Sequence, residues 1–263
     1  MKLCFSTIGC PDWRFADIVS AAKDLGYSAI EIRGIEGEIY APAVKELTSD
    51  YAKTAELLER TGIKIAMLTS GAALADHSVK GKSVDEAKAY IDLADKIGVP
   101  FVRVMSTDKP YFDGGDEALC KAQYAEVVKY AEGSVVTPLM ETNGLFVDTA
   151  KLASFLDEIG GKSGALWDVH HPYRFNDESV AQTVANLGGK IKYVHLKDSV
   201  IEKGKTAYKM MGYGDIPVKE AIETLKYNEF DGYYTFEWVK RWNRELEDAG
   251  IVFANYASYM KRL

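Results

Sequence analysis

The feature that most constrains the fold is a pattern repeated eight times along the 263 residues. Each time, a short apolar run rich in strand-forming residues is followed by a loop and a longer amphipathic segment, which usually ends near glycine. Glycine closes the last turn of a helix because it adopts the left-handed conformation at little cost, and apolar residues at a 3.6-residue period mark one helix face. We therefore predict strands at 2–8, 29–33, 64–69, 101–105, 136–141, 164–169, 191–196 and 232–238, and helices at 14–25, 50–61, 84–97, 117–132, 148–159, 179–187, 218–227 and 244–261.

Eight strand–helix pairs in one chain of this length predict an α/β protein, a (β/α)8 TIM barrel, whose typical length is about 250 residues. Near-continuous apolar strands are typical of a parallel sheet covered on both faces. The alternative is an open doubly wound sheet, but the segment 8–11 after the first strand is not the glycine-rich loop of that fold. Because no linker, charge block or low-complexity segment interrupts the pattern, we expect residues 1–263 to form a single domain.

Four loops are longer than the rest, and all four follow predicted strands. In a barrel, loops that follow strands lie on the C-terminal face, where active sites form. We therefore expect the functional residues to gather near the loops 34–49, 70–82, 106–116 and 199–217.

Composition excludes several classes of protein. Thirty-two basic against 39 acidic residues give a net charge of −7, so the basic stripe of a nucleic-acid-binding protein is not expected. The longest uncharged run, 249–260, is well short of the about 20 residues that span a bilayer, and the N-terminus does not resemble a signal peptide. Three cysteines without a CxxC motif favour a cytoplasmic protein with buried thiols rather than disulfides.

One ionisable residue interrupts each of the last four apolar strands near its C-terminal end. These residues are Glu141, Asp168, His195 and Glu237. A charge at the end of a buried strand is unfavourable unless it is paired or binds a metal, and three carboxylates in one region repel one another without a cation. Carboxylate oxygens and an imidazole suit one divalent ion such as Mn²⁺, Mg²⁺, Co²⁺ or Zn²⁺. The pattern therefore predicts a metal site built from these four residues.

The chain resembles the xylose-isomerase-like sugar phosphate isomerase/epimerase barrels over essentially its whole length. The resemblance rests on the order and spacing of five motifs: Glu141-Thr142-Asn143, Trp167-Asp168-Val169-His170-His171, Val194-His195-Leu196-Lys197-Asp198, Gly212-Tyr213-Gly214-Asp215-Ile216-Pro217 and Phe236-Glu237-Trp238. A sixth segment, Glu31-Ile32-Arg33, matches more weakly. The resemblance implies the same four metal ligands. It also implies that His171, which completes an Asp-x-x-His pair with Asp168, contacts the substrate.

Two positions depart from the sugar epimerases of this family. Ile201 stands where those enzymes often carry a substrate-binding arginine, and Phe146-Val147 stands where a second glutamate is common. Both departures argue against a ketohexose epimerase, and neither touches the predicted metal site.

The predicted activity is a divalent-metal-dependent isomerase or epimerase of carbohydrate metabolism that removes a proton next to a carbonyl of a small sugar or sugar-phosphate. The metal would orient the substrate and stabilise the enediolate. As the resemblance implies, Glu141 and Glu237 would take the proton and return it.

Four residues are predicted to bind substrate. His171 would contact a hydroxyl or oxyanion, the alternative being that it only holds a neighbouring carboxylate. Trp13 would form an apolar wall, and Arg33 would hold a substrate oxygen or pair with Glu31 or Glu36. Lys197 follows the metal histidine and would bind substrate or pair with Asp198.

Two further features of the sequence have open interpretations. Gly212 and Gly214 would cradle a phosphate or form a tight turn before the next helix. His77 lies in a long loop and has no partner that the sequence identifies.

Three other functions remain as alternatives. A sugar-acid or inosose-type dehydratase on the same barrel would begin with the same proton abstraction. A non-catalytic sugar-binding barrel would bind metal without chemistry. An AP endonuclease would need several more histidines on the early strands than the four in this chain provide. We expect no nucleic-acid or membrane partner, and the resemblance suggests a homo-oligomer.

Overall fold

The strand order confirms the barrel prediction and excludes the doubly wound sheet. A computed structural model describes all 263 residues. Its eight parallel strands close into a barrel in the order β1-β10-β7-β6-β5-β4-β3-β2. Their bounds are β1 Lys2–Ser6, β2 Ala29–Ile32, β3 Lys64–Ala73, β4 Phe101–Met105, β5 Thr137–Glu141, β6 Gly164–Asp168, β7 Ile191–Leu196 and β10 Tyr233–Phe236.

The chain divides into two compact units. The first unit contains Met1–Ala66 and His195–Leu263, and the second contains Met67–Val194. The single domain expected for residues 1–263 stays a prediction.

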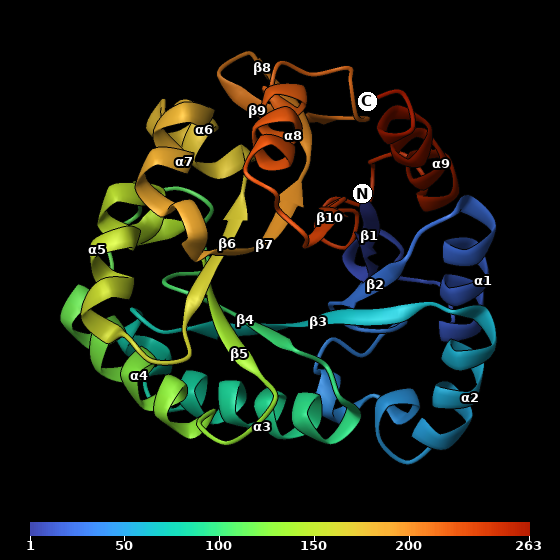
Figure 1. Ribbon diagram of the computed structural model, residues 1–263, viewed down its shortest axis with the longest axis horizontal. Helices are drawn as coiled ribbons and strands as arrows, with labels where there is room; N and C mark the ends of the chain where they lie inside the picture. The colour runs from blue at the N-terminus through green and yellow to red at the C-terminus, as the bar shows by residue number, and fades with distance from the viewer. The chain divides into compact units, whose positions relative to one another are not determined.

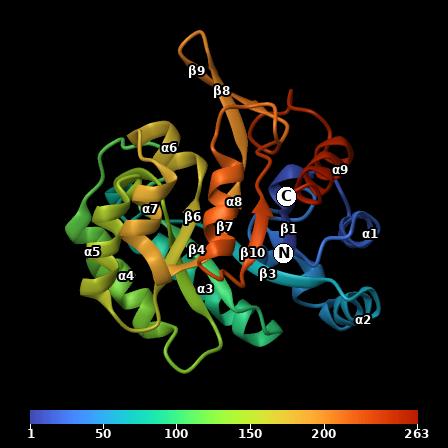
Figure 2. The same cartoon turned by 45° about the horizontal axis from the view of Figure 1, so that its top comes forward.

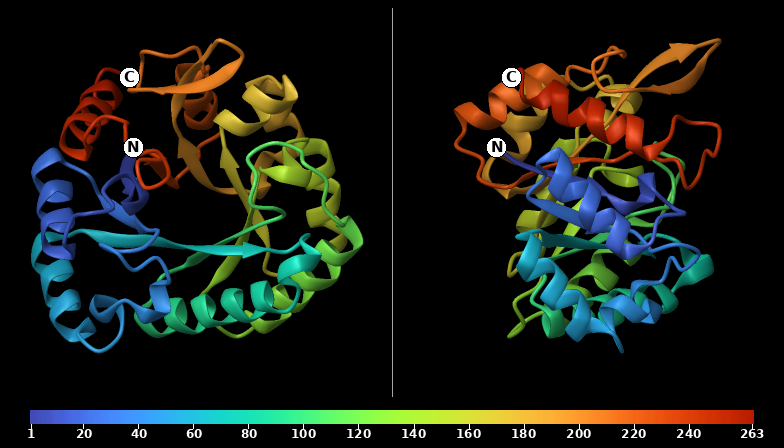
Figure 3. Two further views of the ribbon diagram at one scale, coloured as in Figure 1. Left: turned by 180° about the vertical axis from the view of Figure 1, so that it is seen from behind. Right: turned by 90° about the vertical axis from the view of Figure 1, so that its right-hand side faces the viewer.

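In the first unit, β1 lies between β2 and β10. Cys4 of β1 is in register with Ala29 of β2 and with Thr235 of β10. The helices of this unit are α1 Phe15–Leu25, α2 Tyr51–Thr61, α8 Val218–Tyr227 and α9 Ala249–Met260. Helices α1 and α9 lie side by side (Figure 3).

An aromatic cluster joins α9 to the strands of the first unit. Phe253 of α9 stacks on Phe5 with ring centroids 4.0 Å apart, and Tyr256 stacks on Phe236 at 4.8 Å. All four side chains are buried. Because aromatic side chains bury large apolar areas, this cluster anchors the last helix on its sheet.

In the second unit, β4 pairs with β3 and β5, and β5 pairs with β6. The helices are α3 Lys82–Ile97, α4 Glu117–Tyr130, α5 Thr149–Ile159, α6 His170–Asn176 and α7 Val180–Leu187. Figure 1 shows α3, α4 and α5 along the outer side of these strands. Leu139 of β5 is in register with Arg103 of β4 and with Gly164 of β6, so the C-terminal ends of these neighbouring strands meet at one edge.

The glycine signal identifies most helix ends correctly. Gly26, Gly62 and Gly98 each follow their helix with φ of 82°, 72° and 74°, the left-handed conformation that glycine favours. Helix α4 is the exception, because it ends at Tyr130 and is capped by Ala131 in the right-handed conformation, before Gly133.

The structure adds elements that the sequence pattern did not predict. β8 Asp198–Glu202, which begins one residue before the predicted loop 199–217, and β9 Lys205–Lys209 form an antiparallel hairpin. This hairpin extends beyond the helices of its own unit (Figure 2). Helix α6 was also not predicted, β3 runs to Ala73 instead of ending at residue 69, and the last helix begins at Ala249 rather than at residue 244. Six short 3-10 helices complete the structure: Thr7–Gly9, Ala41–Ala43, Lys45–Leu47, His77–Val79, Gly144–Phe146 and Gly188–Lys190.

None of the helices combines the length and the apolar character that crossing a membrane requires.

Candidate metal centre

The four predicted metal ligands all stand at or near strand ends and are all buried. Glu141 and Asp168 are the last residues of β5 and β6, His195 precedes the last residue of β7, and Glu237 follows β10 directly. Their exposed fractions are 2%, 0%, 0% and 6%, respectively. Buried acidic and histidine side chains of this kind can hold a metal ion.

In the first unit, His195 lies between two glutamates. Its Nε2 is 2.7 Å from Oε2 of Glu31, and its Nδ1 is 3.4 Å from Oε1 of Glu237. The other oxygen of Glu237 accepts a hydrogen bond from Nζ of Lys197. Glu237 is therefore held by a lysine on one oxygen and faces an imidazole with the other.

In the second unit, Glu141 has the same kind of surroundings. Its Oε2 accepts a hydrogen bond of 2.7 Å from Nη1 of Arg103, and its Oε1 is 3.8 Å from Nδ1 of His171. The other ring nitrogen of His171, Nε2, is 3.4 Å from Oδ2 of Asp168. A basic side chain thus holds one oxygen of each of the two glutamates predicted to move protons.

Asp168 begins the turn that leads from β6 into α6. Its Oδ1 accepts a 3.0 Å hydrogen bond from the backbone N–H of His170, so this oxygen is fixed while Oδ2 faces His171. Asp168, His170 and His171 are all buried, and one ligand atom of each lies within 4.8 Å of the others.

The spacing of these donor atoms fits a shared ion. A separation of 3.4 Å between a carboxylate oxygen and an imidazole nitrogen is long for a direct hydrogen bond. Two ligands that each bind one ion at about 2.0–2.2 Å lie about 3 Å or slightly more from each other. The pair His195–Glu237 has this spacing, and carboxylates with an imidazole are the donor set that such ions prefer.

Lys197 and Asp198 do not pair with each other, so that alternative is wrong. Lys197 contacts Glu237, and Asp198 accepts backbone N–H groups from Gly212 and Gly214 at 3.0 and 2.9 Å. Burial raises the pKa of the Asp198 carboxyl, and its backbone hydrogen bonds oppose this shift.

The same contacts explain the Gly212-x-Gly214 motif. The two amides that would cradle a phosphate already donate to a carboxylate of the protein. A Cβ at Gly214 would lie 2.0 Å from Oδ1 of Asp198, so only glycine allows this approach. The structure therefore supports the tight-turn interpretation.

The other predicted substrate residues occupy partly buried positions in the first unit. Trp13 packs edge-on against Phe253 with centroids 5.8 Å apart. The guanidinium of Arg33 lies 5.8 Å from the ring centroid of Trp242, and its Nη1 is 3.4 Å from the carbonyl oxygen of Ile39. The substrate roles of Trp13, Arg33, Lys197 and His171 stay predictions. Trp167 and Trp238, by contrast, are fully buried and fill the core.

Two aromatic side chains that the sequence did not identify as site residues, Phe175 of α6 and Tyr111, lie near His171 or next to its neighbour. The ring centroid of Phe175 lies 6.1 Å from that of His171 and 5.7 Å from that of Tyr111. Tyr111 belongs to the loop 106–116, one of the four long loops, and is 44% exposed. Phe175 therefore offers an apolar surface beside the histidine, and Tyr111 extends it.

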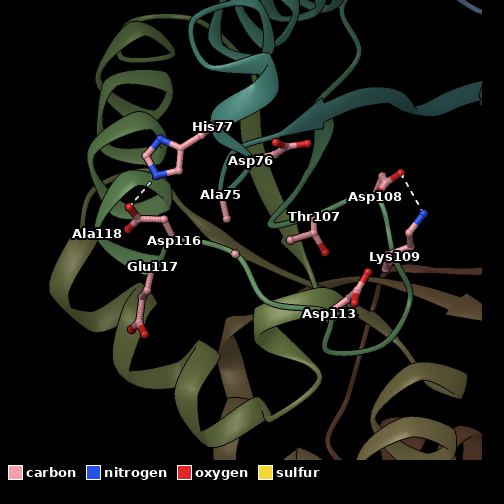
Figure 4. A pocket seen from close by; sticks show the side chains of 11 residues that line it. Ala75, Asp76, His77, Thr107, Asp108, Lys109, Asp113, Asp116, Glu117 and Ala118 are labelled. Atoms are coloured by element: carbon pink, nitrogen blue, oxygen red, sulfur yellow. Dashed lines mark hydrogen bonds and ion pairs between the residues drawn. The ribbon is translucent and has the colours of Figure 1, made fainter.

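A pocket of the second unit lies between the loops that follow β3 and β4 (Figure 4). It is an open pocket of about 820 Å³. His77 has a partner here, because its Nε2 is 2.8 Å from Oδ2 of Asp116. Most of the other charged side chains that line the pocket are acidic: Asp76, Asp108, Asp113 and Glu117, with Lys109 as the basic exception.

Two residues of the site were missed as contacts of the predicted ligands. The sequence pattern predicts Glu31 only as a partner of Arg33 and assigns no role to Arg103. Both interrupt apolar strands, in Ile30-Glu31-Ile32 and in Val102-Arg103-Val104. The rule used on the last four strands, one ionisable residue in an apolar run, would have found them on β2 and β4.

Comparison with known protein families decides the family. The sequence model of the xylose isomerase-like TIM barrel matches residues 19–254. The chain belongs to the xylose isomerase-like TIM barrel family. The resemblance noted in the sequence is thus confirmed, whereas a search of curated proteins gives no match.

Three solved structures share the fold at low sequence identity. The probable 3-DHS dehydratase AsbF from Bacillus anthracis is 16% identical, with a TM-score of 0.80 and 99% of each chain covered. A D-allulose 3-epimerase from Methylomonas sp., in complex with D-allulose, is 16% identical, with a TM-score of 0.77 over 100% of this chain and 96% of that one. A xylose isomerase-like TIM barrel protein from Mycobacterium smegmatis, in complex with magnesium, is 14% identical, with a TM-score of 0.76 over 99% and 95%.

Proposed function

We propose that the protein is a divalent-metal-dependent sugar or sugar-phosphate isomerase or epimerase. The observation that carries the proposal is the buried pair His195–Glu237, whose facing nitrogen and oxygen are 3.4 Å apart. This spacing suits a shared ion, and two more buried carboxylates, Glu141 and Asp168, stand at strand ends of the same barrel.

Glu141, Asp168, His195 and Glu237 would hold the ion. Their strands β5, β6, β7 and β10 are successive neighbours in the barrel order, and parallel strands direct their C-terminal ends to one face. A divalent ion supplies Lewis-acid chemistry, which polarises a carbonyl and stabilises the negative charge that develops when the adjacent carbon loses its proton. That one structural relative was solved with magnesium supports the proposal.

The two glutamates are suited to proton transfer. One of them would take the proton from the carbon next to the carbonyl, and the other would return it to the neighbouring carbon or to the opposite face. Arg103 and Lys197 each donate a hydrogen bond to one oxygen of their glutamate, which fixes the orientation of the carboxylate. Because the other oxygen would bind the ion, the oxygen beside the basic side chain would be the one that takes or returns the proton.

His171 would contact a substrate hydroxyl or oxyanion. Asp168 and Glu141 lie on its two sides, and Phe175 packs against its ring. The apolar C–H face of a sugar suits an aromatic surface, so we include Tyr111 and Phe175 as a wall of the substrate site.

A metal-dependent dehydratase is the second candidate function. It would begin with the same abstraction of a proton and then expel a hydroxyl group. The likeness to the probable 3-DHS dehydratase favours keeping it, and so does Ile201, which is apolar and 50% exposed where sugar epimerases often carry an arginine.

Exchange of substrate protons with solvent tests the proposal. The protein with added Mn²⁺ is incubated in D₂O with a panel of ketoses, ketose phosphates and keto-acids. We expect one class of substrate to gain deuterium next to its carbonyl. Retained product mass, apart from the deuterium, identifies an isomerase or epimerase, and loss of water identifies the dehydratase.

The Glu237→Gln variant should not catalyse exchange, while Glu223→Gln, a substitution at an exposed glutamate of α8, should behave as the wild type. If the protein binds Mn²⁺ but no compound exchanges, the non-catalytic sugar-binding barrel replaces the enzyme.

A further inference from the structure

We propose that Glu31 is a positioning residue, which keeps the proton on Nε2 of His195 so that Nδ1 is the nitrogen offered to the metal. The inference rests on the proposed function, because it assigns a role within the same metal site. It adds a residue on β2 to a site otherwise built from the ends of later strands.

The geometry around His195 distinguishes its two ring nitrogens. Nε2 is 2.7 Å from Oε2 of Glu31, whereas Nδ1 is 3.4 Å from Oε1 of Glu237. An ionised carboxylate only accepts hydrogen bonds, so the contact with Glu31 requires a proton on Nε2. In a neutral imidazole, the lone pair then resides on Nδ1, which faces the predicted ligand Glu237.

Burial makes this contact effective. The side chains of Glu31 and His195 are both 0% exposed, so water does not compete for Nε2. Histidines that bind metals usually donate their other N–H to a carboxylate or carbonyl, which sets the tautomer and ring orientation, and loss of that partner weakens metal binding about 10- to 100-fold.

The contact with His195 is the one hydrogen bond of the Glu31 carboxylate. Its Oε1 is buried and has no hydrogen-bond partner, so the carboxylate is held in an apolar strand by the contact with His195. Replacement of Glu31 alone would leave the N–H on Nε2 of His195 buried without an acceptor, so a loss of stability is expected whether or not Glu31 positions the histidine. The tautomer of His195 and the metal affinity, rather than stability, therefore distinguish a positioning role from a purely structural one.

The test compares three variants with the wild type. Glu31→Leu removes the acceptor, and Glu31→Gln restores an oxygen that can accept from Nε2. Glu178→Gln is the matched control, because Glu178 is also buried but accepts hydrogen bonds from Thr149 and Thr183.

Two readouts are needed, and neither is activity. Nitrogen-15 NMR of histidine-labelled protein, metal-free and loaded with Mg²⁺, reports which nitrogen of His195 carries a slowly exchanging proton. The spectrum is simple because the chain has four histidines. Titration with Mn²⁺ gives the affinity, and thermal unfolding of the metal-free protein shows whether each variant folds.

We expect a protected proton on Nε2 of His195 in the wild type and in Glu178→Gln, with and without Mg²⁺. In Glu31→Leu this protection should be lost and Mn²⁺ affinity should fall about 10- to 100-fold, with partial recovery in Glu31→Gln. A proton on Nδ1, or equal affinity in the wild type and Glu31→Leu, would overturn the role of Glu31. Absence of Mn²⁺ binding by the wild type would instead refute the proposed function.

Discussion

Each glutamate predicted to move a proton accepts a hydrogen bond from a basic side chain on one oxygen and faces a histidine with the other. For Glu237 these neighbours are Lys197 and His195. Glu237→Gln keeps the shape of the side chain but removes its basicity. We expect turnover to fall at least about 100-fold, as for loss of a general acid–base group, measured on the substrate that the exchange panel identifies. Turnover close to that of the wild type would remove Glu237 from the mechanism.

Lys197 provides a second prediction, for stability. Its side chain is 2% exposed and it pairs with a buried carboxylate. Removal of one partner from a buried ion pair leaves an uncompensated charge and costs about 3–5 kcal/mol. Lys197→Met in the metal-free protein should therefore lower the free energy of unfolding by about 3 kcal/mol in urea denaturation. Lys219→Met, at an exposed pair on α8, should change it by less than about 1 kcal/mol.

The cysteines provide a third prediction. Cys4, Cys10 and Cys120 are free and buried. Burial raises the pKa of the Cys120 thiol to about 12 and that of Cys10 still further. Since the thiolate is the reactive form, native protein should not react with Ellman's reagent at pH 8, and denatured protein should release the equivalent of three thiols. Rapid reaction of folded protein would contradict this burial.

At the scale of elements, the turn around Asp198 makes a sharp prediction. A Cβ at Gly214 would meet Asp198 Oδ1 at 2.0 Å and the carbonyl oxygen of Ser199 at 2.5 Å. Gly214→Ala must displace this turn, so we expect a loss of about 1–3 kcal/mol in the free energy of unfolding. Gly37→Ala is the matched control, since nothing lies within 4 Å of its Cβ position. Equal stability of the two variants would show that the turn adapts freely.

The elements that sequence reasoning missed are short. The hairpin β8–β9 turns through Lys203 and Gly204, both with positive φ, which is typical of a two-residue hairpin loop. The sequence pattern predicts one long loop here, because a strand–helix repeat contains no hairpin. Helix α6 has seven residues and starts directly after β6, so it was too short for the 3.6-residue period to reveal.

At the scale of the molecule, the barrel could be predicted because its signal is repeated eight times, so an error at one boundary does not change the topology. The candidate ligands could be predicted because each breaks an apolar strand at its end. Their partners could not, since the contacts of Glu31 with His195 and of Arg103 with Glu141 join residues 164 and 38 positions apart. Only the folded sheet brings such side chains together.

One divalent ion, held by Glu141, Asp168, His195 and Glu237, is what we propose for the whole molecule. A bound ion at a free concentration of 100 times its dissociation constant would stabilise the fold by about 2.7 kcal/mol, so removal with EDTA should lower the melting temperature and Mn²⁺ should restore it. The loss of stability should be absent from variants that do not bind the ion.

The most direct measurement is the number of Mn²⁺ ions bound per chain, counted by electron paramagnetic resonance titration of the wild type and of Glu141→Gln, Asp168→Asn, His195→Gln and Glu237→Gln. We predict one tightly bound ion in the wild type and strongly weakened binding in all four variants. A wild-type protein that binds no ion, or four variants that bind it as tightly as the wild type, would contradict the account.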